Sequence, residues 1–497
     1  MSFLAALLVL VGCSPDGSDD EADGSEGVDG AEVPHGVQLA AESIDDVTGS
    51  PISLYEIEGE LVGFAFERGE AITVLRSSDN GESWSVDRPA ELQPASESLR
   101  WGYQFGSPGG DIGIYQDGPV FLTMSLLPTG TGPADLHPDP YTAPVFAAIS
   151  TDAARTWRVV DLPGPEGWTA YPLSLAVTGE RIVIGGSEAT PGEPLDSAEL
   201  FDAAVWYSDD DGASWSRSDS TSLAMPSGDQ EIRALVENEG TLIAAGVDTI
   251  DAHADWQQCC RWAEQIVVWL SDDAGASWRR AEFPMLDMTT PVAEEQGRLV
   301  LTSSNGHLVL ENDGYWGEAY SSSDQGETWE TGSPPPSDSD VPVLRLNTMF
   351  FGDVALEVGI NNIACDCLQV SISTKAVDES WDDRDEELPI PPCDETTTRP
   401  RHGLYGPPLV VPGTADTFVA LGFCLHGDDY VPIVATARGI DGEWSLSQPE
   451  NLATAGIVAN DNVGSLVEVA GPVEVEERLV ALVGGQTGQL TVVEISS

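Results

Sequence analysis

The sequence predicts an all-β fold made of many short strands and turns. The chain of 497 residues contains 51 glycines and 34 prolines, and long helical patterns are few. In addition, an eight-residue pattern, Ser-x-Asp-x-Gly-x-x-Trp, recurs along the chain, and its copies follow short apolar runs such as ITVLRS and IVVWLS. A turn sequence that recurs between strand-like runs indicates a β-hairpin used repeatedly.

Five copies of this pattern, which we call the octets, end at a tryptophan. In each octet the aspartate is expected to accept hydrogen bonds from turn amides, the glycine to supply a positive φ, and the tryptophan to pack under the turn. These aspartates are therefore structural, and neither catalysis nor calcium binding is assigned to them. The aspartate and tryptophan pairs are Asp79 and Trp84, Asp152 and Trp157, Asp210 and Trp215, Asp273 and Trp278, and Asp324 and Trp329; the second octet has Ala154 in place of glycine. Two degraded copies end at Trp381 and Trp444.

The octet resembles the Asp-box, or BNR, repeat of sialidase-like β-propellers. The resemblance implies a β-propeller of four-stranded antiparallel blades, and the seven tryptophans are spaced 60 residues apart on average, about one blade each. The sequence allows seven or eight blades, and we favour eight. Two runs near the C-terminus, EERLVALVGG and QLTVVEIS, read as strands of a last blade without an octet. A strand within 36–42 is expected to complete that blade and close the ring.

The N-terminus predicts a lipid anchor. Residues 1–12 contain an apolar core of signal-peptide length and end in Leu-Val-Gly before Cys13, which resembles the bacterial lipobox. Cys13 is then the expected lipidation site. Residues 13–35, which include eight acidic residues, are expected to form a disordered tether, and 36–497 a single propeller domain. The predicted location is the cell envelope, lipid-anchored on the outer face of a bacterial membrane.

The charge restricts the classes of partner. The chain has 84 acidic and 20 basic residues, a formal net charge of −64, and Lys375 as its one lysine. This charge argues against nucleic acid and against lying flat on anionic lipid. The expected contact with the membrane is therefore through the lipid anchor only. We expect a monomer without a cofactor that binds an unidentified glycan, peptide or protein.

Six further cysteines suggest disulfides outside the cytoplasm, although the pairing is open: Cys259, Cys260, Cys365, Cys367, Cys393 and Cys424. The last four are expected to be near neighbours in the fold. Cys259 and Cys260 would then form a strained vicinal bridge, or one of them would bridge to another loop. A metal site at Cys365 and Cys367 is disfavoured by their spacing, and no metal is assigned.

Long loops are expected on the face opposite the octets, where binding sites of rigid rings are usually built. These loops are 90–110, 129–141, 251–264 and 394–407. Cations beside aromatic side chains grip carboxylates or sugar rings, although the same residues also serve to hold long loops down. The candidate ligand-binding residues in these loops are Trp101, Trp262, Arg401 and Tyr405.

The sialidase resemblance implies three arginines for a sugar carboxylate, the first in an Arg-Ile-Pro motif, with a tyrosine nucleophile. No Arg-Ile-Pro sequence precedes Trp84, whereas Arg233 and Arg345 fall in predicted inner strands, and Arg401 and Tyr405 fall where the last arginine and the tyrosine are expected. No residue is assigned as catalytic. The sequence thus favours a non-catalytic binding or scaffold module. The alternative is an exo-sialidase-like glycoside hydrolase with a divergent active site.

Overall fold

The computed structural model is all β in the part of the chain that it describes, apart from two short 3₁₀ turns, η2 (Ala90–Leu92) and η4 (Ser220–Ser222). The described residues are 38–67, 71–92, 112–126, 145–189, 201–223, 229–251, 262–283, 299–304, 307–312, 318–332, 343–351, 354–363, 367–376, 388–389, 402–404, 409–410, 417–426, 429–438, 445–447, 468–476, 478–484 and 489–496.

Within these ranges the strands form eight antiparallel sheets, seven of them built from consecutive strands. The first two sheets contain β2 (Ser50–Ile57), β3 (Glu60–Glu67), β4 (Ala71–Ser77) and β5 (Ser85–Asp87), then β6 (Ile112–Asp117), β7 (Val120–Leu126), β8 (Val145–Ser150) and β9 (Arg158–Val159). The third and fourth contain β10 (Thr169–Thr178), β11 (Arg181–Ala189), β12 (Phe201–Ser208) and β13 (Ser216–Arg217), then β14 (Asp229–Asn238), β15 (Thr241–Asp251), β16 (Trp262–Ser271) and β17 (Arg279–Arg280).

The fifth and sixth sheets contain β18 (Leu299–Ser304), β19 (His307–Asn312), β20 (Glu318–Ser322) and β21 (Glu330–Gly332), then β22 (Val343–Phe351), β23 (Val354–Ile363), β24 (Cys367–Ala376) and β25 (Leu388–Pro389). In the seventh sheet, β26 (His402–Leu404) and β27 (Leu409–Val410) both pair with β28 (Thr417–His426), followed by β29 (Asp429–Arg438) and β30 (Ser445–Ser447). The eighth joins β31 (Glu468–Val475), β32 (Arg478–Gly484) and β33 (Gln489–Ser496) to β1 (Gln38–Thr48).

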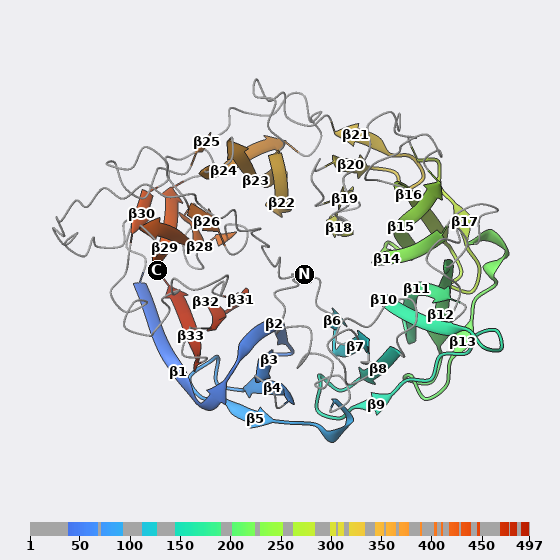
Figure 1. Cartoon of the computed structure of the whole chain (residues 1–497), viewed down its shortest axis with the longest axis horizontal. Helices are drawn as coiled ribbons and strands as arrows, with labels where there is room; N and C mark the ends of the chain where they lie inside the picture. The colour runs from blue at the N-terminus through green and yellow to red at the C-terminus, as the bar shows by residue number, and fades with distance from the viewer. Residues whose placement is uncertain are drawn as a thin grey trace, which may run out of the picture.

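Figure 1 shows these sheets around a central axis, with the first strand of each of the first seven sheets, and β31 of the eighth, nearest the centre, as in a β-propeller. The β-propeller fold class predicted from the sequence is therefore confirmed. Eight is the number of sheets among the described residues, which is the larger of the two blade numbers that the sequence allowed.

The N-terminal strand closes the last sheet, as predicted. β1 pairs antiparallel with β33, from Gln38 opposite Ser496 to Ser43 opposite Thr491. Because the two strands come from opposite ends of the described chain, this pairing ties the ends of the ring together. An apolar cluster at the same junction includes Leu54 and Leu61 of the first sheet with Leu482 of the eighth.

The core lies between neighbouring sheets rather than in the middle of the ring. Separate clusters of buried side chains join the first and second sheets and each following pair up to the fourth and fifth. Phe64, Trp206 and Trp269 are completely buried in these clusters. Full burial of one such side chain stabilises the fold by about 2–3 kcal/mol, so each inter-sheet contact is a small hydrophobic core.

The five octets have the predicted turn geometry. In the third octet the Oδ1 atom of Asp210 accepts the amide of Ser214 at 2.7 Å, and in the fifth Asp324 accepts the amide of Thr328 at 2.9 Å. Equivalent bonds form at Asp79, Asp152 and Asp273. Gly81, Gly212, Gly275 and Gly326 have φ values of 99°, 74°, 86° and 83°, and Ala154 adopts 59° in the same position.

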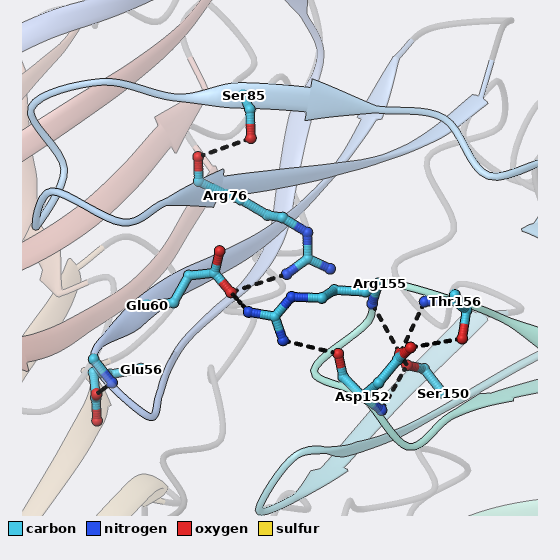
Figure 2. Close-up of polar contacts among 9 residues, drawn as sticks. Glu56, Glu60, Arg76, Ser85, Ser150, Asp152, Arg155 and Thr156 are labelled. Carbon is cyan, nitrogen blue, oxygen red and sulfur yellow. Dashed lines mark hydrogen bonds and ion pairs between the residues drawn. The ribbon is translucent and has the colours of Figure 1, made fainter.

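Each of these octets also contacts a preceding sheet or the last one. A Cβ built on Gly275 would lie 3.2 Å from Cγ1 of Val183 in the third sheet, and one on Gly81 would lie 3.7 Å from Cγ1 of Val480 in the eighth. On the side of the ring that carries the octets, which we call the octet face, arginine side chains form further polar contacts between sheets. Figure 2 shows Arg155 of the second octet donating to Glu60 of the first sheet at 2.6 Å, beside Arg76, which donates to the same oxygen at 3.3 Å.

No helix in the described ranges has the length and apolar character needed to span a membrane.

Candidate functional site

The face of the ring opposite the octets is where the second and third strands of each sheet are joined, and we call it the loop face. The octets follow the third strands, for example β12 and β16, so the antiparallel strand order puts the other connections at the opposite end. Three consecutive sheets, the second to the fourth, have long connections of this kind: residues 127–144, 190–200 and 252–261. The asymmetry in loop length therefore favours this side of the ring as the place of a site.

A β-bulge interrupts five of the eight described inner strands, in the half nearest the loop face. In β14 the register shifts between Ile232 and Ala234, so that Arg233 falls between two aligned residue pairs of β14 and β15. The same shift occurs at Ile52 in β2, Leu173 in β10 and Leu346 in β22, and around Gly471 in β31. A bulge turns a side chain away from the regular alternation of a strand. The bulged residue of these inner strands therefore has a side-chain direction that differs from that of its neighbours, and this recurs around the centre of the ring.

Glycine on the neighbouring strand permits two of these bulges. A Cβ built on Gly246 would lie 1.9 Å from the carbonyl oxygen of Glu231, and one on Gly186 would lie 1.9 Å from that of Tyr171. No side chain fits at such a distance, because the obstructing atom belongs to the backbone. In the first sheet the residue opposite Pro51, just before the bulge, is Ala65, which is also small.

Arg233 occupies the bulge in the fourth sheet and forms an ion pair with Glu231 of the same strand. Its Nη2 atom lies 3.0 Å from Oε2 of Glu231, and its Nε donates to that oxygen at 3.1 Å. The two side chains are 15% and 24% exposed, whereas Ile232 between them is completely buried. The pair lies on β14, the strand of the fourth sheet nearest the centre of the ring (Figure 1), and combines a positive and a negative group that are both partly exposed.

Buried polar side chains form hydrogen bonds next to this ion pair, between β14 and the neighbouring strand β15. Nε2 of Gln230 donates to Oδ1 of Asp248 at 2.8 Å, and both residues are buried. In the third sheet Glu188 stands at the position that corresponds to Asp248, two residues beyond the bulge glycine, and receives both Nε and Nη2 of Arg217. Hydrogen-bonded buried groups have few alternative arrangements, so these pairs make the loop-face ends of the two sheets rigid.

Arg233 and Arg345, which the sequence analysis treated as equivalent candidates, differ in their register within the sheets. Arg233 and Arg345 both lie in first strands of their sheets, β14 and β22, as predicted. Their registers differ, however. Arg345 pairs with Gly359 immediately before its bulge, which is the position of Ile232 in β14, and not that of Arg233. The two arginines are therefore not equivalent around the ring.

Other predicted site residues fall partly outside the described ranges. Trp101, Arg401 and Tyr405 lie outside them, as does Cys13. Trp262, which the sequence placed in a loop, is instead the first residue of β16 and pairs with Asp251. The predicted loop over 394–407 likewise contains strand β26, which pairs with β28. These parts of the two predicted loops are strand instead, because backbone pairing extends from β15 to Trp262 and from β28 to His402–Leu404. Most of both loops lies outside the described residues.

Two of the cysteines lie in described strands at the loop face. Cys367 opens β24 opposite Ile363, and Cys424 in β28 pairs with His402 and Val431. Their sheets contact each other through β24 and β26. Cys259, Cys260, Cys365 and Cys393 lie outside the described residues, and the disulfide pairing stays a prediction.

No cluster of three or more potential metal ligands occurs among the residues that the structure describes. The octet aspartates accept hydrogen bonds within their own turns, as the bonds from Ser214 to Asp210 and from Thr328 to Asp324 show.

The sequence reasoning missed several residues near the candidate site, namely Glu231, Gln230, Asp248 and the pair of Glu188 with Arg217. The available signal was the glycine within the strands GERIVIGG and TLIAAG, because glycine inside a strand often marks a bulge.

Comparison with known proteins yields structural similarity only. No protein-family model matches the chain, and no curated protein sequence matches it. Among solved structures, YCF48 bound to D1 peptide has a TM-score of 0.41 at 10% identity, with 92% of this chain and 97% of that chain covered. A PL25 ulvan lyase has a TM-score of 0.45 at 9% identity, covering 91% and 95%. A Trypanosoma rangeli sialidase mutant has 0.36 at 12% identity, covering 94% and 96%. At these scores the similarities carry no argument about function.

Proposed function

We propose that the protein is a lipid-anchored, extracytoplasmic β-propeller that binds a glycan, a peptide or an envelope protein at its loop face. The observation that carries the proposal is the ion pair of Arg233 with Glu231 on the innermost strand of the fourth sheet. The pair is held at a bulge and supported by buried polar contacts, so its position is set before a ligand arrives. Preorganised polar groups on a rigid scaffold are the usual form of a binding site.

The charge of the chain supports a polar ligand over a highly anionic one. With a net charge of −64 and the Arg233 guanidinium already balanced by Glu231, a polyanion would be repelled on approach. A sugar or a peptide backbone offers neutral donors and acceptors that match a carboxylate and a guanidinium at once.

The anchoring half of the proposal rests on the lipobox-like sequence before Cys13. Replacing Cys13 with serine removes the thiol that acylation requires. We expect the full-length protein to fractionate with membranes and the Cys13→Ser variant to appear in the soluble fraction. A variant that stays with the membranes to the same extent as the native chain would refute lipid anchoring at this residue.

The binding site is tested with Arg233→Met in the full-length protein. The native chain is screened on a glycan array and in pull-downs from envelope extracts, and each captured ligand is then measured against the variant. Arg279→Met is the matched control, because Arg279 pairs with Glu327 on the octet face. We expect loss of binding with Arg233→Met alone. Equal losses, or none, would remove the loop face around Arg233 as the site.

The alternative function, a sialidase-like glycoside hydrolase, is tested by an activity assay. Fluorogenic sialosides and a small glycoside panel are incubated with the folded native protein, and the expected result is no turnover. Turnover that disappears in both Arg345→Ala and Tyr405→Ala would instead establish a divergent sialidase-like glycoside hydrolase.

A further inference from the structure

One outer strand of the ring differs from all the others that the structure describes. The outermost strands of the first seven sheets, β5, β9, β13, β17, β21, β25 and β30, have two or three residues each. In the eighth sheet the outermost strand is β1, with 11 residues. Figure 1 shows β1 along the rim of the ring.

Short outer strands are a protection, because an edge strand exposes unpaired backbone N–H and C=O groups to any passing chain. β1, with 11 residues, is not protected by a short length. Its residues from Gln38 to Ser43 pair in regular register with β33 on one side. Among the described strands, none pairs with its other side. Regular, extended backbone with an edge that no described strand pairs is the template for addition of a further strand.

The chemistry of β1 determines which strand fits. Its sequence, QLAAESIDDVT, contains the acids Glu42, Asp45 and Asp46 and no basic residue. Glu42 and the neighbouring Ala40 are exposed. A second copy of this chain would place acidic residues against acidic residues, which is unfavourable across paired strands. A chain carrying lysine or arginine would instead be attracted, both locally and by the net charge of −64.

We propose that the outer edge of β1, which no described strand pairs, binds an extended basic segment of a partner protein as an added β-strand. The backbone of residues 38–43 supplies the hydrogen bonds, and Glu42 supplies the charge that selects lysine or arginine. This surface lies on the rim of the ring, so the proposal is independent of any ligand at the loop face.

The test uses two labelled octapeptides with the full-length protein, one alternating lysine and valine and the other alternating glutamate and valine. Binding is followed by fluorescence anisotropy, and the site by hydrogen exchange of the amides of residues 38–43. The lysine peptide is expected to bind and to slow exchange at these amides, while the glutamate peptide is expected not to bind.

Two charge reversals at exposed positions separate a local effect from a general one. Glu42→Lys is expected to weaken the lysine peptide about tenfold. Glu180→Lys, which makes the same change on an exposed residue of the turn between β10 and β11 in the third sheet, is expected to have little effect. Circular dichroism confirms that both variants are folded.

Three results would overturn the proposal: equal weakening by the two variants, binding without protection of residues 38–43, or no binding of the lysine peptide. Slow exchange at these amides without peptide, together with dimers in sedimentation, would assign the edge to a second copy of the chain instead.

Discussion

The guanidinium of Arg217 donates to both carboxylate oxygens of Glu188, with Nε 2.8 Å from Oε1 and Nη2 2.7 Å from Oε2. The carboxylate is almost completely buried, at 1% exposure, while Arg217 is 24% exposed. The two residues come from β11 and β13, so the pair spans β12 between them. A buried charge is tolerated only when its partner is present, so the third sheet depends on this contact.

Arg217→Met is expected to lower the free energy of unfolding by about 3 kcal/mol, because it leaves the Glu188 carboxylate buried without a counter-charge. The double variant Arg217→Met, Glu188→Met is expected to recover most of this loss, since no buried charge remains. Urea denaturation of the single and double variants measures both effects.

The matched control for this experiment is Arg279→Met. Arg279 and Glu327 are 43% and 52% exposed, and removing an exposed pair costs less than about 1 kcal/mol. A loss at Arg217 no larger than that at Arg279 would contradict the importance of burial for this pair.

The octet aspartates are expected to control stability in acid. Hydrogen bonds from the side chain and the amide of Ser214, and from the Ser208 hydroxyl, lower the pKa of Asp210 to about 2. The pKa of an aspartate in the unfolded chain is about 3.9. Because the folded pKa is the lower one, the ionised carboxylate stabilises the fold above about pH 4, and this contribution disappears as the pH falls through about 2.

We therefore expect Asp210→Asn to be less stable than the native protein at pH 5, with the difference narrowing as the pH falls toward 2. Unfolding by urea at several pH values gives the difference. As a local readout, Ser214→Ala removes the largest cause of the shift, so carboxyl NMR should show a higher pKa for Asp210. A stability difference that stays constant from pH 5 to pH 2 would refute this account.

Local turn chemistry made much of the fold predictable. The octet combines an acceptor side chain, a residue that tolerates positive φ and a large aromatic ring, and this combination has one compact solution. The five octets therefore located their hairpins in the sequence. The closing strand was also predictable, because QLTVVEIS lacked a fourth strand of its own and an apolar run near Gln38 was unassigned.

The candidate site was much less predictable, for two physical reasons. A bulge shifts the alternation of buried and exposed residues, so the placement of Arg233 relative to Arg345 could not be read from spacing. Burial of a carboxylate depends on a partner distant in sequence, and Glu188 and Asp248 look like any of the 84 acids until Arg217 and Gln230 are placed beside them.

The octet glycines are expected to matter for packing as well as for φ. Gly275 has a φ of 86°, and a Cβ there would lie 3.2 Å and 3.3 Å from the two methyl groups of Val183. Gly240 has a φ of 91°, with nothing within 4 Å of an added Cβ. Gly240→Ala should therefore cost about 1 kcal/mol for the left-handed backbone alone, and Gly275→Ala about 2–3 kcal/mol because overpacking is added.

Chemical denaturation of the two glycine variants makes this comparison directly. If Gly275→Ala costs no more than Gly240→Ala, then the contact of the fourth octet with the third sheet is soft and does not hold the two sheets in place.

The position of Arg233 is expected to depend on Gly246. A Cβ at Gly246 would lie 1.9 Å from the carbonyl oxygen of Glu231, far inside van der Waals contact, so β14 and β15 have to separate or the bulge has to move. Gly246→Ala should therefore cost more than about 3 kcal/mol, clearly more than Gly275→Ala. If the variant folds, hydrogen exchange at the amides of 229–236 should be faster than in the native protein, because the ladder opens around the bulge. Native stability with unchanged exchange would mean that the bulge adapts freely. In that case Arg233 would not be held in place before a ligand binds, and the preorganisation on which the proposed binding site rests would be lost.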